Sequence, residues 1–434
     1  MGWRFAEVDS DRRAACENAA MNALPRRLGH LGSRRTLRVA AMLLLGLAVL
    51  AVAASAQQAA EAETATEERF PIVEPLGDGV WAALQPAARR FSDSNSVVVD
   101  LGGELLLVDT QADGEATDRL LDWIDATLDL PVRWLVNTHW HVDHVAGNER
   151  VVARHPGVTI VAHDTLEQDV PGRAADLLAE DADRLAAAIE DARAKLGRGE
   201  GLDGSALDAA GRERLAAQIA AAEERERALR ETSLTAPSLL YTERLTLPAG
   251  DGAAPRVELL HFAAHTDGDT ILWLPGPGIL ITGDVVDALP YGGHGHPRQW
   301  LATLDRLAEL APRVLAPGHG PVYREQIAEA GQDAQPEESE PGAGEQLERL
   351  RRLFADILAA VDEELSAGGS LESLRAGLLE RPEMKALRAL LSVDEAGERA
   401  FDDFVPATAE RAWEEATAPE AESHAQGDPD ADGR

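Results

Sequence analysis

The string His139-Trp140-His141-Val142-Asp143-His144 places three imidazoles and a carboxylate within one short stretch. The whole chain has only 12 histidines, so scattered surface residues would rarely produce this density. Histidines two positions apart on a tight loop can converge on one metal ion, and the Asp and His that follow point to a neighbouring position. The string therefore predicts a metal site with donors for two ions.

Three further short motifs carry imidazole or carboxylate groups later in the chain. They are Ala264-His265-Thr266-Asp267-Gly268-Asp269, Thr282-Gly283-Asp284 and Pro317-Gly318-His319-Gly320. Each follows a short apolar run of the kind that forms a buried strand. In this order, and together with Asn137–His144, the motifs resemble those of the metallo-β-lactamase superfamily. The resemblance extends roughly from Pro71 to Tyr323.

The resemblance implies an α/β fold, an αββα sandwich, and a site for two zinc ions. The implied ligands are His139, His141 and His265 for the first zinc, Asp143, His144 and His319 for the second, and Asp284 as a bridge between them. One carboxylate can span two ions roughly 3.5 to 4 Å apart. Asp143 and Asp284 are the expected catalytic carboxylates, and Asp143 is expected to orient the nucleophile as well as to bind metal.

Position 284 narrows the expected chemistry. The resemblance implies Cys or Ser here in the β-lactamases of this fold, but a bridging Asp in glyoxalase II, in lactonases and in related hydrolases. Two zinc ions lower the pKa of a shared water towards about 7, and the hydroxide attacks a carbonyl. Asp284 therefore favours a small-molecule ester, lactone, thioester or amide as substrate, with a β-lactam as a less favoured alternative.

Two other classes of function stay open at this point. Persulfide dioxygenases share the fold and much of the ligand set but use one iron ion, and His and Asp donors alone do not separate Zn from Fe. A non-catalytic binding module is the third class. The complete ligand set argues against it, because inactive relatives usually lose ligands.

A Gly-rich run after Asp284, Tyr291-Gly292-Gly293-His294-Gly295-His296, supplies candidate substrate contacts. Loops of this composition can line a binding site, so His294 and His296 are expected either to touch substrate or to be exposed loop residues. Asp109 follows an apolar run and is expected to hydrogen-bond a ligand histidine. Asp267 and Asp269 are expected to hold the loop after His265 and not to touch metal.

The elements that position these motifs follow from the apolar patterns. Strands are expected at 96–100, 104–109, 134–137, 158–162, 239–247, 256–262, 270–274, 279–282 and 314–316, and helices at 115–128, 297–310, 346–360 and 371–391. Residues 166–236 are rich in Ala, Glu, Arg and Leu, and predict a helical hairpin (174–196 and 206–230) inserted between strands. The hairpin is either a solvated structural insertion or a lid over the site.

The amino terminus has the pattern of a cleaved export signal. Basic residues precede the apolar run 39–54, and Ala54-Ser55-Ala56 offers a cleavage site. The run is shorter than the roughly 20 residues of a membrane span, so no stable insertion is expected after cleavage. Ser33-Arg34-Arg35-Thr36-Leu37 resembles the start of a twin-arginine signal. A periplasmic or secreted protein is therefore expected.

The remaining sequence completes the expected organisation. The expected segments are a signal peptide (1–56), a flexible mature amino terminus (57–69), the metallo-β-lactamase-fold domain (70–325), an acidic linker (326–345), a small C-terminal helical appendage (346–412) and a disordered acidic tail (413–434). The formal net charge of −35 excludes nucleic acid as an expected partner, because phosphate backbones are bound by Lys and Arg surfaces.

Overall fold

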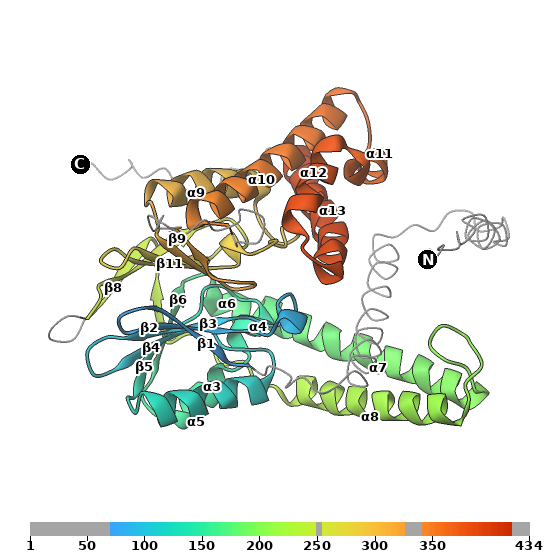
Figure 1. The fold of residues 1–434 in the computed structure, drawn as a ribbon, viewed down its shortest axis with the longest axis horizontal. Coiled ribbons are helices and arrows are strands. Elements are labelled where there is room, and N and C mark those ends of the chain that lie inside the picture. The colour runs from blue at the N-terminus through green and yellow to red at the C-terminus, as the bar shows by residue number, and fades with distance from the viewer. Residues whose placement is uncertain (1–69, 249–253, 326–340, 419–434) are drawn as a thin grey trace, which may run out of the picture. The chain divides into compact units, whose positions relative to one another are not determined.

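The computed structural model describes residues 70–248, 254–325 and 341–418. Within them the chain forms two β-sheets (Figure 1). The first sheet has the order β1-β2-β3-β4-β5-β6-β7 and the second has the order β13-β12-β11-β10-β9-β8. The proposed signal segment, most of the expected linker and most of the expected tail lie outside the described residues.

The first sheet begins with an antiparallel meander and continues with parallel strands. Its strands are β1 (Ile72–Gly77), β2 (Val80–Leu84), β3 (Ser96–Asp100), β4 (Leu105–Val108), β5 (Val132–Val136), β6 (Thr159–His163) and β7 (Leu239–Tyr241). Helices α3 (Gly114–Thr127) and α5 (Asn148–Arg154) cover its outer face (Figure 1). The apolar stripe Leu120, Leu121 and Ile124 of α3 is fully buried there, as its helical spacing predicts.

The second sheet carries the remaining site segments. Its strands are β8 (Arg244–Leu247), β9 (Val257–Phe262), β10 (Asp269–Leu274), β11 (Ile279–Gly283), β12 (Val314–Pro317) and β13 (Tyr323–Arg324). Helix α9 (Pro297–Glu309) lies on its outer face, and α10 (Ala343–Ser366) packs on α9 (Figure 1). Trp300 of α9 is fully buried, and its Nε1 donates a hydrogen bond to the carbonyl of Val285 at 3.0 Å.

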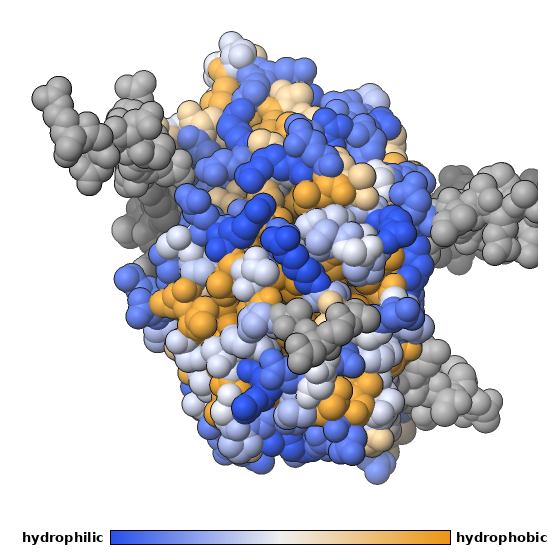
Figure 2. Space-filling model, turned by 90° about the vertical axis from the view of Figure 1, so that its left-hand side faces the viewer, coloured by the Kyte–Doolittle hydropathy of each residue, from blue (hydrophilic) through white to orange (hydrophobic). Residues whose placement is uncertain are grey.

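Apolar side chains from both sheets form a common core between them, among them Val99, Val136, Leu272 and Ile281. Helix, sheet, sheet and helix thus form four layers, and the expected αββα sandwich is confirmed. Hydrophilic residues cover most of the face seen in Figure 2, with hydrophobic residues gathered mainly across its middle.

The strand expected at 239–247 is wrong as one element. It divides into β7, which pairs with β6 of the first sheet, and β8, which pairs with β9 of the second. The chain crosses between the sheets at Thr242 and Glu243. In β8 the exposed Arg244 and Thr246 alternate with leucines, whereas β7 has no exposed residue. No Gly or Pro lies between the two strands, so the apolar pattern alone does not reveal the break.

The expected insertion is helical. It contains a four-residue helix α6 (Leu166–Asp169), a π-helical turn η3 (Val170–Ala174), and the long helices α7 (Ala175–Arg198) and α8 (Ala209–Glu231). Arg230 of α8 donates a hydrogen bond to Asp183 of α7 at 2.9 Å, as in an antiparallel hairpin. The segment Ala187–Ile219 belongs to one compact unit, and the rest of the described residues belong to a second.

The C-terminal helices share a core with α9 and the second sheet. The single helix expected at 371–391 is wrong, because Pro382 starts a new helix there. The observed helices are α11 (Leu371–Gly377), α12 (Pro382–Leu391) and α13 (Glu395–Thr417), with a short 3₁₀ turn at Leu378–Glu380. No helix among the described residues is long and apolar enough to span a membrane.

Candidate metal centre

Loops at one edge of both sheets carry all seven predicted ligands. The loop after β5 and the short helix α4 (Val142–Val145) hold His139, His141, Asp143 and His144. The ends of β9, β11 and β12 hold the other three ligands, His265, Asp284 and His319. Each sheet therefore supplies part of the site, which explains why the motifs are far apart in sequence.

The first group of donor atoms comes from His139, His141, His265 and Asp284. Nδ1 of His141 lies 2.9 Å from Nε2 of both His139 and His265. Oδ2 of Asp284 lies 3.6 Å from Nε2 of His139 and 3.4 Å from Nε2 of His265. All four side chains are buried, and these atoms converge as ligands of one ion would.

The second group comes from Asp143, His144 and His319. Oδ2 of Asp143 lies 3.2 Å from Nε2 of His319 and 3.6 Å from Nε2 of His144. Asp284 adjoins this group as well, since its Oδ1 lies 3.2 Å from Nε2 of His144. Its Oδ2 also lies 3.5 Å from Nε2 of His319, so Asp284 contacts histidines of both groups, as a bridging carboxylate would.

Glycines allow Asp284 and the His319 loop to approach each other. A Cβ atom on Gly318 would lie 2.1 Å from Oδ1 of Asp284, so a residue with a Cβ atom would clash with that oxygen. Gly283 has a φ of 49°, a left-handed conformation that glycine adopts at little cost.

Hydrogen bonds from neighbouring residues fix the donors. Oδ2 of Asp109 accepts from Nδ1 of His144 at 2.8 Å, in agreement with the expected role of Asp109. Asp269 accepts hydrogen bonds from the backbone N–H groups of Ala264, His265 and Thr266 at 2.7 to 3.1 Å. It therefore holds the loop of His265, as expected, and is absent from both donor groups.

Burial and the two carboxylates set the protonation of the site. Burial holds the pKa of His139 and His141 well below the usual value and lowers the pKa of His265 to about 4. For His144 burial acts in the same direction, but the charges of Asp284 and Asp143 outweigh it and raise the pKa well above its usual value. The three histidines of the first group are thus neutral and free to bind a cation, while the carboxylates beside His144 attract positive charge.

Several supporting residues are not apparent from the sequence motifs. The Ser94 hydroxyl lies 2.7 Å from the backbone carbonyl of Asp143, and Oδ1 of Asp287 accepts from the backbone N–H of His319 at 2.9 Å. Nδ2 of Asn95 donates to the carbonyls of Pro317 and Gly320, which frame His319. For Ser94 and Asn95, the sequence signal is the polar run Ser92-Asp93-Ser94-Asn95, which lies directly before an apolar strand.

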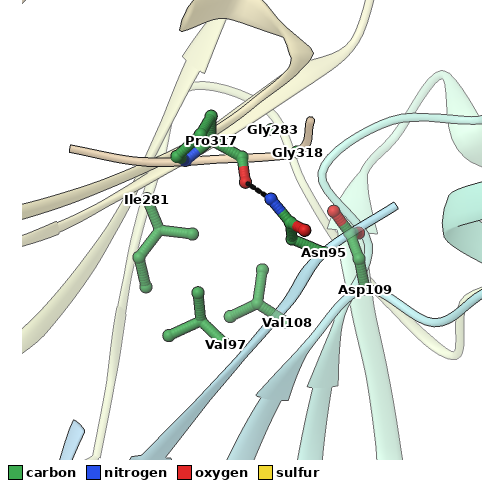
Figure 3. Close-up of a pocket in the computed structure, with 8 residues that line it drawn as sticks. All are labelled: Asn95, Val97, Val108, Asp109, Ile281, Gly283, Pro317 and Gly318. Carbon is green, nitrogen blue, oxygen red and sulfur yellow. Dashed lines mark hydrogen bonds between the residues drawn. The ribbon is translucent and has the colours of Figure 1, made fainter. Parts of the chain in front are cut away.

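A small pocket lies behind the donor groups, between the two sheets. Figure 3 shows Val97 and Val108 of the first sheet and Ile281 of the second on its apolar side, with the Asn95 amide bonded to Pro317 across it. Four of its lining residues adjoin the donor groups: Asp109 bonds His144, Gly283 precedes Asp284, and Pro317 and Gly318 precede His319.

The two histidines expected near substrate differ in position. Nδ1 of His294 lies 2.9 Å from Nε2 of His141, so His294 adjoins the first group. His296 bonds Asp267 through Nε2 at 2.6 Å and Glu415 of α13 through Nδ1 at 3.2 Å. Both ring nitrogens of His296 already have partners, and substrate contact by either histidine stays a prediction.

Comparison with known proteins identifies the same family that the order of the motifs suggests. The family description "Metallo-beta-lactamase superfamily" matches residues 89–319. A metallo-beta-lactamase from Pontibacter korlensis is 20% identical, and the match covers 65% of this chain and 98% of that chain with a TM-score of 0.40. TMB-1 is 18% identical, with 59% and 92% covered and a TM-score of 0.39.

A third similar structure is a metallo beta lactamase from Erythrobacter litoralis with beta mercaptoethanol in its active site. It is 19% identical, with 60% of this chain and 93% of that chain covered and a TM-score of 0.39. The match of residues 89–319 to the family spans more than half of the chain and confirms the resemblance expected from the motifs. The protein is a member of the metallo-β-lactamase superfamily, with a buried cluster of His and Asp side chains that could bind metal.

Proposed function

We propose that this protein is an exported dinuclear-zinc hydrolase that cleaves a small-molecule ester, lactone, thioester or amide. The observation that supports this best is the position of Asp284, whose carboxylate lies within 3.6 Å of His139 and His265 of the first group and within 3.5 Å of His144 and His319 of the second. A carboxylate shared in this way suits two adjacent ions.

The donor set fits zinc. All seven groups offer imidazole nitrogen or carboxylate oxygen, which zinc accepts. Nε2 of His144 and Oδ1 of Asp284 are buried without a hydrogen-bond partner among the described residues. Buried polar atoms are normally paired, so these two atoms support a cation between them. When bound, two zinc ions supply a water of lowered pKa and a Lewis acid for a carbonyl oxygen.

The protein groups around the site have separate tasks in this proposal. Asp143 is the most exposed of the seven side chains at 23%, which supports an approach of substrate and water from its side of the site. Burial opposes its charge, but His144 and His319 hold its pKa below the usual range, so it is a carboxylate at neutral pH. Asp143 is thus able to accept a hydrogen bond from a water and orient it towards a carbonyl.

Metal analysis combined with a substrate panel tests the proposal. We expect about two zinc ions per chain and turnover of at least one ester, lactone or thioester. Asp284→Ala should lower the metal content and abolish turnover, and His141→Ala should do the same by removing the central donor of the first group. Asp122→Ala is the control, because Asp122 lies at an exposed position of α3 and outside both donor groups.

Two results would contradict the proposed hydrolase function. Stoichiometric iron with oxidation of a persulfide would favour the dioxygenase chemistry. Full metal content without turnover of any substrate in the panel, β-lactams included, would favour a binding module.

Export rests on the amino-terminal sequence. The single cysteine, Cys16, lies before the expected cleavage site, so the mature protein would contain no thiol open to oxidation. Mass spectrometry of the amino terminus from fractionated cells should find a start near Gln57, and Lys in place of Arg34 and Arg35 should retain the precursor inside if the twin-arginine route is used. An intact amino terminus on protein from the cytoplasm would contradict export.

A further inference from the structure

The loop 291–296 connects the donor group of the first metal site to the C-terminal helix α13. Nε2 of His141 lies 2.9 Å from Nδ1 of His294, while Nδ1 of His141 is the atom that faces His139 and His265. An imidazole that binds metal through one nitrogen carries its proton on the other, and the partner of that proton fixes the ring. Nδ1 of His294 is placed to accept a hydrogen bond from the protonated Nε2 of His141.

The His294 ring is itself held by neighbours. Trp140 lies 5.6 Å from it between ring centroids, and the ring of Tyr291 contacts it edge-on at 5.3 Å. Its Nδ1 faces Nε2 of His141, and a neutral imidazole offers one acceptor nitrogen.

Helix α13 bonds to the backbone on both sides of His294. The hydroxyl of Thr408 accepts from the N–H of Gly292 at 3.1 Å, and Nε of Arg411 donates to the carbonyl of Gly295 at 2.8 Å. A Cβ atom on Gly292 would lie 2.4 Å from Oγ1 of Thr408, so the loop is in close contact with the helix.

From these contacts we infer that His294 is a positioning residue for His141, and that α13 sets the position of His294 through Thr408 and Arg411. The C-terminal helices then contribute to metal affinity as well as to the core. This inference rests on the proposed metal site, because the role of His294 is to leave Nδ1 of His141 free for an ion.

Two variants of His294 test the contact itself. His294→Ala removes the acceptor and should weaken binding of one of the two zinc ions by about 10- to 100-fold, the usual effect of losing such a partner. His294→Gln keeps an acceptor oxygen on a side chain of similar reach and should recover part of that affinity. Zinc affinities are measured by competition with a chromogenic chelator, and cobalt(II) substitution reports the geometry of the remaining site.

Two threonines of α13 test the role of the helix. Thr408→Val removes the hydroxyl that accepts from Gly292, and we expect the affinity for one zinc ion to fall by about 3- to 10-fold. Thr417→Val is the matched control. Both hydroxyls bond the carbonyl four residues earlier at 2.8 Å, but only Thr408 also bonds the loop. Thr417→Val should therefore bind zinc like the unaltered protein.

The tautomer of His141 gives a readout that does not depend on bound metal. NMR of ¹⁵N-histidine in the metal-free protein should show His141 protonated on Nε2, and His294→Ala should redistribute the proton between the two nitrogens. A proton on Nδ1 in the unaltered protein, or equal zinc affinity in His294→Ala, would overturn the inference. Failure of the unaltered protein to bind zinc, with His141 still protonated on Nε2, would instead overturn the proposed function alone.

Discussion

Oδ2 of Asp109 accepts a hydrogen bond from Nδ1 of His144 at 2.8 Å, and the same carboxylate accepts from the backbone N–H and the hydroxyl of Thr138. Asp109 follows β4 in a left-handed conformation with φ at 60°. Because the bond places the proton of His144 on Nδ1, it leaves Nε2 directed at Asp143 and Asp284. One residue after a strand thus determines which nitrogen of His144 is available to bind a metal ion.

Asp109→Asn should weaken metal binding without unfolding the protein. Asn tolerates a positive φ, so the backbone is preserved, but its amide N–H₂ would favour a proton on Nε2 of His144. We expect metal affinity to fall by about 10- to 100-fold, measured by competition with a chelator. Asp122→Asn, at an exposed position of α3, is the control and should have no effect. Unchanged affinity in Asp109→Asn would show that the tautomer is set elsewhere.

Gly318→Ala should disturb the bridge between the donor groups. The new Cβ atom would lie 2.1 Å from Oδ1 of Asp284, so this carboxylate must turn away from His144. The expected result is a fall from about two bound metal ions per chain to about one or fewer, measured by elemental analysis. Gly344→Ala, where a Cβ atom meets nothing within 4 Å, should keep full metal content. Full metal content in both variants would contradict the bridging geometry.

The ion pairs of His296 should make stability depend on pH. Hydrogen bonds to Asp267 and then Glu415 raise the pKa of His296 from 6.5 to about 9. Because the folded pKa is the higher one, this stabilisation is complete below pH 6.5 and is lost as the pH rises through about 9.

The variant His296→Asn provides the measurement. The difference in free energy of unfolding between the unaltered protein and His296→Asn should be about 1 to 3 kcal/mol near pH 6 and should decline towards pH 10. Denaturant titrations at several pH values supply these free energies. A difference that stays constant over this range would show that the pairs do not stabilise the fold through the charge of His296.

Removing the outer part of the helical insertion should leave the metal site intact. Ala187–Ile219 belongs to a different compact unit from the donor groups and contains none of their residues. We expect a chain with a short Gly-rich turn in place of these residues to retain its metal content. A change in KM across several substrates with the same metal content would support a lid, whereas equal kinetics would support a structural insertion.

The sequence predicts the site better than it predicts the connections. The seven ligand positions are visible because His and Asp at strand ends have few structural reasons to cluster, and the strands that carry them are short apolar runs. The division of 239–247 between two sheets cannot be predicted from the apolar pattern. The strands β7 and β8 follow each other closely in sequence and differ in the strands with which they pair. The buried stripe of α13 consists mostly of small residues such as Ala400, Ala409 and Ala412, and the helix contains Pro406, so neither its length nor its contacts with the loop 291–296 are evident from the sequence.

The distribution of the ligands over both sheets has a consequence for folding. His139, His141, Asp143 and His144 follow a strand of the first sheet, whereas His265, Asp284 and His319 follow strands of the second. Ions bound here would act as crosslinks between the two layers of the sandwich. Each ion at a free concentration of 100 times its Kd would add about 2.7 kcal/mol to the free energy of unfolding. Zinc scarcity would then loosen the sandwich as a whole, and the amount of intact protein would follow the supply of the metal.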